Sequence, residues 1–279
     1  MIKPGTPAVC SWSLRPTSPA DLAEKVKACG LDAVQLALDP VRTGAWDESD
    51  LVRTLNDAGI RLVSGMMATA GEDYTTIESI RRTGGVRPDA TWEENLAAAR
   101  ANADLAARLG LPLVTFHAGF IPEDEADPEW AKLLGRVRAV VDVFAAKGVR
   151  IGFETGQESA ATLLRVLDAL DRPGAGVNFD PANMILYGTG DPVAALTDLA
   201  PRVVQAHVKD AVRAGRPGVW GEEVPAGTGE VDWDGFFAAL ARAPGPGLVI
   251  EREAGERRVE DVRLAAAMIR ERSAGRVGA

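Results

Sequence analysis

The sequence has few of the residues that build zinc clusters, and it has too little positive charge for a nucleic-acid site. It contains two histidines and two cysteines in 279 residues, and its formal net charge is −9. A closed structural zinc site takes cysteine and histidine ligands, and nucleic-acid affinity depends largely on positive charge. We therefore expect no structural zinc site and no nucleic-acid partner.

Long apolar runs are also missing. No stretch approaches the roughly 20 apolar residues of a membrane-spanning helix, and residues 1–12 lack the basic start and apolar run of a secretory signal. These absences predict a cytoplasmic protein with no membrane partner. We expect Cys10 and Cys29 to be reduced thiols in the core, because disulfides are rare in that compartment.

Strand-like and helix-like segments alternate along the whole chain. The predicted strands are residues 8–14, 33–38, 61–68, 113–119, 150–154, 176–180, 203–209 and 247–252. Each is followed by a predicted helix, and eight such units within about 250 residues are typical of a (β/α)8 TIM barrel. An open doubly wound sheet is the alternative. No shift in composition divides the chain, so we predict a single domain over residues 1–279.

One predicted connection is unusually long. Residues 70–90 are polar and include Gly84, Gly85 and Pro88. Loops of this length are uncommon inside compact domains and often cover a functional site. We therefore expect a lid here.

Four consecutive predicted strands, the fifth to the eighth, end in metal-binding side chains, Glu154, Asp180, His207 and Glu251. Each stands on the strand face opposite the apolar residues, and the carboxyl ends of barrel strands meet at one place. Three carboxylates brought together need a cation. One imidazole with three carboxylates favours Mn²⁺, with Mg²⁺, Co²⁺ or Zn²⁺ as alternatives.

The same strand ends resemble those of a known family. Residues 152–156 (GFETG), 178–183 (NFDPAN), 207–210 (HVKD), 249–251 (VIE) and 227–233 (GTGEVDW) are similar to the motifs of the xylose isomerase-like TIM-barrel superfamily of sugar phosphate isomerases and epimerases. The resemblance covers nearly the whole chain. It implies that Glu154, Asp180, His207 and Glu251 hold one divalent ion, usually manganese. It also implies that the two glutamates face each other across a bound ketose.

This resemblance implies proton transfer next to a carbonyl group. A bound metal would stabilise the enediolate formed from a small keto-sugar, sugar phosphate or polyol. Glu154 and Glu251 are the predicted catalytic pair, one taking the proton and the other returning it. Return to the opposite face gives an epimer, and return to the adjacent carbon gives an aldose–ketose isomer.

Four further residues are predicted to contact the substrate. His117 ends the fourth predicted strand and should lie beside the first glutamate of the pair. Asn183 stands where several related epimerases carry histidine, and Arg213 stands where they often place a substrate-binding arginine. Lys209 is the fourth, although it could instead pair with its neighbour in the chain. Trp12 is expected to pack in the core, with stacking on a sugar face as the alternative.

Other functions remain open at this point. The same metal site would serve an inosose dehydratase-like enzyme or a keto-glycoside lyase. An endonuclease IV-like phosphodiesterase is disfavoured, because that chemistry needs several histidines, and a non-catalytic sugar-binding barrel is disfavoured by the two glutamates. The expected partner is a small carbohydrate, with a homodimer left open. No GxGxxG or P-loop motif predicts phosphate binding.

Overall fold

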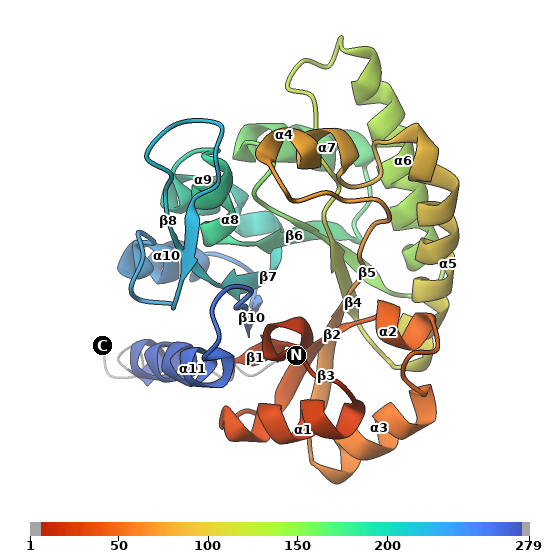
Figure 1. The fold of residues 1–279 in the computed structure, drawn as a ribbon. Coiled ribbons are helices and arrows are strands. Elements are labelled where there is room, and N and C mark those ends of the chain that lie inside the picture. The colour runs from red at the N-terminus through yellow and green to blue at the C-terminus, as the bar shows by residue number, and fades with distance from the viewer. Residues whose placement is uncertain (1–6, 275–279) are drawn as a thin grey trace.

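Eight parallel strands close into a barrel with helices around it (Figure 1), which confirms the predicted (β/α)8 fold. The computed structural model describes residues 7–274. The barrel strands are β1 (Ala8–Cys10), β2 (Ala33–Ala37), β3 (Arg61–Met66), β4 (Leu113–Phe116), β5 (Arg150–Glu154), β6 (Ala175–Phe179), β7 (Val203–Val208) and β10 (Gly247–Ile250). Each pairs with its neighbour in this order, and β10 closes the barrel on β1.

The helices pack on the outside of this barrel (Figure 1). They are α1 (Pro19–Ala28), α2 (Asp39–Arg42), α3 (Glu48–Asp57), α4 (Ile77–Thr83), α5 (Trp92–Arg108), α6 (Pro128–Ala145), α7 (Ala160–Leu170), α8 (Pro181–Tyr187), α9 (Pro192–Leu199), α10 (Trp233–Leu240) and α11 (Arg258–Ala274). Several begin at a side chain that accepts a backbone N–H, among them Ser18, Asp47 and Asp191. Within residues 7–274, none of them is long and apolar enough to cross a membrane.

The secondary structure of two segments, the predicted strand 8–14 and the predicted loop 70–90, differs from the prediction. The first strand ends at Cys10, because the chain turns into a 3₁₀ helix, Ser11–Leu14, that ends at the left-handed residue Arg15. The lid region contains α4, where Thr76 and Ser79 form a reciprocal capping box. The expectation of a long loop without secondary structure was therefore wrong.

The barrel strands bury two different sets of side chains, an apolar set outside the barrel and a polar set inside it. The outward-facing strand residues pack against the helices in one large apolar core, with Phe116, Phe153 and Phe179 among its largest buried side chains. Inside the barrel the chain instead buries polar side chains, at Gln35, Ser64, Thr115, Asn178 and Gln205. Beyond β7, a short antiparallel hairpin of β8 (Asp210–Val212) and β9 (Glu222–Val224) leaves the barrel.

Both cysteines are buried and free, as the sequence predicts. Burial raises the pKa of the Cys29 thiol to about 12, and burial also raises the pKa of the Cys10 thiol. Both groups are therefore held as uncharged thiols.

Candidate metal centre

Four side chains from consecutive strand ends meet inside the barrel. Glu154 ends β5, Asp180 follows β6, His207 lies in β7 and Glu251 follows β10. All four are buried, and one ligand atom from each lies within 4.8 Å of the others. The His207 Nδ1 atom is 3.4 Å from Glu154 Oε1, 3.5 Å from Asp180 Oδ2 and 3.3 Å from Glu251 Oε2. The metal ring, as we call these four side chains, brings together the residues that the strand ends predict.

Two atoms of the metal ring fit a cation directly. Within the described residues, Asp180 Oδ2 and His207 Nδ1 are buried and have no hydrogen-bond partner. The other oxygen of Asp180 caps α8 by accepting from the Asn183 amide at 2.9 Å. Buried polar atoms are nearly always partnered, so two unpartnered acceptors aimed at one point match the needs of a divalent ion with oxygen and nitrogen ligands.

His207 contacts a residue that the sequence analysis missed. His207 Nε2 lies 2.9 Å from Gln35 Oε1. Because the Gln35 amide nitrogen donates to Thr115 Oγ1 at 2.8 Å, its oxygen is the acceptor for His207 Nε2–H. Asn178 Nδ2 also lies 3.1 Å from His207 Nε2. In the neutral tautomer that donates from Nε2 to Gln35, the lone pair of His207 lies on Nδ1, inside the metal ring. The signal in the sequence was a glutamine in the middle of the apolar strand β2.

A satisfied polar layer supports the ring from below. Gln205 donates to Gln35 Oε1 at 3.0 Å and to Asn178 Oδ1 at 3.1 Å, and it accepts from Ser64 at 2.6 Å. Asn178 in turn donates to Glu154 Oε2 at 3.1 Å. These bonds fix the orientation of the ring residues, because a fully satisfied buried network admits one arrangement.

Charged neighbours control the protonation of Glu251. Its Oε1 accepts from Trp12 Nε1 at 2.8 Å, and its Oε2 accepts from Lys209 Nζ at 2.9 Å. Burial on its own would raise the pKa of Glu251, but Lys209 and His207 hold that pKa well below its usual value. By contrast, burial raises the pKa of Asp180 despite the opposing effect of Lys209. The pKa values of the two ring carboxylates are therefore shifted in opposite directions, down for Glu251 and up for Asp180.

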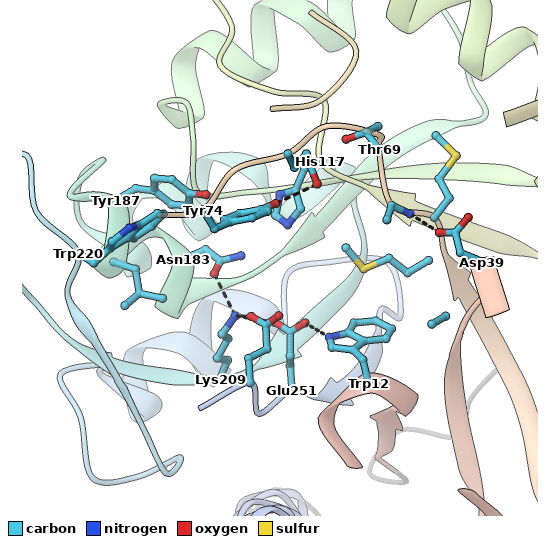
Figure 2. A pocket seen from close by; sticks show the side chains of 17 residues that line it. Trp12, Asp39, Thr69, Tyr74, His117, Asn183, Tyr187, Lys209, Trp220 and Glu251 are labelled. Carbon is cyan, nitrogen blue, oxygen red and sulfur yellow. Dashed lines mark hydrogen bonds and ion pairs between the residues drawn. The ribbon is translucent and has the colours of Figure 1, made fainter. Parts of the chain in front are cut away.

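A cavity of about 450 Å³ opens above the ring (Figure 2). His117, Asn183, Lys209 and Glu251 line it, whereas Glu154 is not among its described lining residues. Glu154 Oε1 instead lies 3.6 Å from His117 Nε2 and accepts from Asn183 Nδ2 at 3.1 Å. Glu251 thus borders the cavity directly, and Glu154 reaches it through His117 and Asn183.

Arg213, a predicted substrate contact, lies away from this cavity. This side chain is 66% exposed, pairs with Glu230 at 2.5 Å and borders a separate surface groove beside α8. Arg213 follows the hairpin strand β8, which has already left the barrel, and so it does not line the cavity above the ring. Trp12 packs partly against a core cluster, while its indole N–H contacts Glu251 and its side chain lines the cavity.

Asp210 has a structural partner other than Lys209. Its carboxylate accepts from the backbone amides of Gly227, Gly229 and Val231 and from the Trp233 indole, at 2.8 to 3.1 Å. It therefore ties residues 227–233 to the end of β7. This contact explains why the segments 207–210 and 227–233 stand out together in the sequence.

Comparison with known proteins identifies the family. The chain matches the family described as "Xylose isomerase-like TIM barrel" over residues 23–272. The chain belongs to this family. The structure is also similar to a xylose isomerase domain protein from Planctomyces limnophilus, with 31% identity, a TM-score of 0.83, and coverage of 98% of this chain and 99% of that one.

Other similar proteins have more specific names. A Mycobacterium smegmatis protein solved with magnesium has 17% identity and a TM-score of 0.73, with 97% of each chain covered. A Methylomonas D-allulose 3-epimerase, solved with D-allulose, has 17% identity and a TM-score of 0.70, with 96% of each chain covered. A 3-oxo-isoapionate decarboxylase from Pectobacterium atrosepticum is 31% identical over 117 residues, which are 40% of this chain and 42% of that enzyme.

Proposed function

We propose that this protein is a divalent-metal-dependent isomerase or epimerase of a small keto-sugar or polyol. The observation that carries the proposal is the buried metal ring, with unpartnered atoms on Asp180 and His207, beneath a cavity large enough for a small ligand. Two family relatives of similar structure are named for epimerisation of L-ribulose and D-allulose. Manganese is the ion we propose, and magnesium is the ion named with the M. smegmatis relative.

A bound divalent cation would draw electron density from the substrate carbonyl and so acidify the neighbouring C–H. We assign removal of that proton to Glu251, because this carboxylate borders the cavity and is held by Trp12 and Lys209. We assign proton return to Glu154, with His117 beside it as the group that connects it to the cavity. Removal of the proton by one group and its return by another is the proton transfer that epimerisation requires.

The remaining cavity residues are assigned to substrate oxygens. Lys209 Nζ donates to Asn183 Oδ1 at 3.2 Å, and both side chains line the cavity next to Glu251. A ligand hydroxyl that inserts between them would meet a donor and an acceptor at once. His117, Asn183 and Lys209 are therefore the proposed substrate contacts.

The test is proton exchange followed by NMR in D₂O. The Mn²⁺-loaded protein is incubated with ketoses, an inosose and hydroxypyruvate, and deuterium is expected at the carbon next to the carbonyl in one class of compound. Glu251→Gln should abolish the exchange even at Mn²⁺ concentrations that saturate the variant, with occupancy checked by calorimetry. Turnover without any deuterium at the reacting carbon would overturn the proposal.

A lyase is the second candidate, and the partial match to a decarboxylase favours keeping it. Both reactions are carried out next to a carbonyl group, but a lyase releases a fragment. The same NMR spectra would then show a product that has lost water, carbon dioxide or an aglycone. An isomerase or epimerase gives a product of unchanged composition.

A further inference from the structure

The cavity has a deep polar end and a shallow aromatic end. At the deep end, Asn183, Lys209 and Glu251 are each 5% exposed or less. At the shallow end, Tyr74 is 45% exposed, and Tyr187 and Trp220 are half-buried. Figure 2 shows these three aromatic rings along one side of the cavity, with Lys209 and Glu251 along another. A ligand whose reacting end lies at the metal ring would extend its far end towards the rings.

The three rings are fixed in place. Tyr187 and Trp220 pack edge-to-face with ring centroids 4.8 Å apart, and Phe120 supports Tyr187 from a centroid distance of 5.7 Å. The Tyr74 hydroxyl donates to Glu72 at 3.2 Å, and Glu72 is itself held by a backbone amide. Within residues 7–274, the Trp220 indole N–H is buried without a partner. Rigid aromatic faces next to an unsatisfied donor suit a ring with a C–H face and hydroxyl acceptors.

The charge of the cavity disfavours an anionic ligand. Among the described lining residues, Lys209 is the only cationic side chain, and it already pairs with Glu251 at 2.9 Å and Glu253 at 2.5 Å. Asp39 and Glu72 add two further carboxylates to the lining. Phosphate and carboxylate ligands are usually held by arginine forks, lysine or free helix N-termini, and this lining offers one neutralised lysine.

We propose that the natural ligand is an uncharged ketose that carries a second ring at the end farthest from its carbonyl group. The second ring occupies what we call the aromatic subsite, formed by Tyr74, Tyr187 and Trp220. The inference rests on the proposed function, because it takes the reacting end of the ketose to lie at the metal ring. It adds a substrate class, a ring-substituted and unphosphorylated keto-sugar.

Three matched sugars test this inference. D-Fructose, isomaltulose (fructose with a glucose ring on its sixth oxygen) and D-fructose 6-phosphate share the ketose end and differ at the far end. Their dissociation constants for the Mn²⁺-loaded protein are measured by calorimetry. One stacked ring contributes on the order of 0.5–1.5 kcal/mol, so isomaltulose should bind up to about tenfold more tightly than fructose. Fructose 6-phosphate should bind more weakly than fructose.

Variants of Trp220 locate the effect. Trp220→Ala should remove most of the preference for isomaltulose over fructose, and Trp220→Phe should retain most of it. Val219→Ala, next to it but facing the separate groove, is the matched control and should keep the preference. Each variant is first shown to bind Mn²⁺ like the parent protein.

The outcomes separate the two proposals. If fructose and isomaltulose bind equally well, or if Trp220→Ala weakens both by the same factor, the aromatic subsite is wrong while the proposed function stands. Tighter binding of fructose 6-phosphate than of fructose would overturn the uncharged substrate class. If none of the three sugars binds to protein that has taken up Mn²⁺, the proposed function for ketoses fails and the subsite fails with it.

Discussion

The deep polar end of the cavity, its floor, and the shallow aromatic end, its rim, are built in different ways. At the floor, side chains project from strand ends into a satisfied polar layer, and the ring atoms have partners across the barrel, such as Gln35 for His207. At the rim, Tyr74 and Trp220 come from connections of different lengths, outside the barrel strands. The floor is therefore suited to one fixed geometry of metal binding, and the rim is the part in which a change of ligand would be accommodated. The following predictions test this division.

The largest effect is expected at the floor, for Asp180→Asn. The substitution keeps the shape and the ability to cap α8, but it removes the charge whose Oδ2 has no partner. Mn²⁺ affinity should fall at least about 100-fold, because ligand loss exceeds the 10–100-fold effect of residues behind the ligands. Calorimetry and the Mn²⁺-induced rise in Tm measure it.

Asp191→Asn is the matched control for this change. Asp191 caps α9 through the Ala194 amide in the same way but lies outside the metal ring. It should leave Mn²⁺ affinity within about twofold. Equal losses for both variants would mean that helix capping, rather than the metal ring, decides the result.

The second prediction concerns the connection between floor and rim. Asp210→Asn should lower the free energy of unfolding by about 3 kcal/mol, since an amide group replaces a buried oxygen that accepts from several N–H groups. Tm should fall by roughly 5–10 °C. Asp232→Asn, which only caps α10, should change Tm by much less. Similar Tm values for the two variants would argue against a specific role for Asp210.

Third, Gln35→Leu should weaken Mn²⁺ binding by about 10–100-fold. Without an acceptor for Nε2–H, His207 is free to adopt the tautomer whose Nδ1 carries the proton. Gln35→Glu keeps an acceptor at this position and should recover most of the affinity. A merely structural role would give both variants the same Mn²⁺ dissociation constant.

Gln35 also shows where sequence reasoning stops. The alternation of side chains along a strand predicts that His207 and Glu251 point inward, and the fold puts their strands next to each other. Gln35 lies on β2, which is not paired with β7, and its contact with His207 spans 172 residues of sequence across the barrel interior. A contact of this kind depends on barrel closure and register, which strand patterns do not contain.

The rim was predicted less well for a related physical reason. Trp12 lies within a predicted strand and Arg213 follows one, but the chain bends into a 3₁₀ helix in one place and a hairpin in the other. Each bend changes the direction of the side chains by an amount that alternation does not give. The alternation of side chains predicts their direction only as far as the strand continues.

Fourth, a buried group outside the cavity should make stability depend on pH. Burial raises the pKa of Glu158, in the connection after β5, to about 8 from a usual value of 4.5. The folded state then holds the Glu158 proton more tightly than the unfolded state does. The stabilisation from this proton is therefore fully present below the unfolded pKa and is lost as pH rises through about 8. Glu158→Gln should have a Tm close to the parent at pH 4 and a Tm several degrees higher at pH 9. The same Tm difference at both values would show that Glu158 does not titrate in this range.

The smallest effect is expected for Arg213→Ala, and it separates the rim of the cavity from the neighbouring surface. Arg213 is exposed and contacts Glu230 rather than the cavity, and exposed ion pairs contribute about 0–1 kcal/mol. The dissociation constants of D-fructose and Mn²⁺ should therefore change by less than about twofold. Lys209→Met, which removes the buried ammonium beside Glu251, should weaken D-fructose binding by about tenfold or more, since hydrogen bonds to charged groups contribute roughly 1.5–3 kcal/mol. A tenfold loss with Arg213→Ala would mean that the hairpin of β8 and β9 closes over the bound sugar, and the boundary between rim and surface would have to be redrawn to include it.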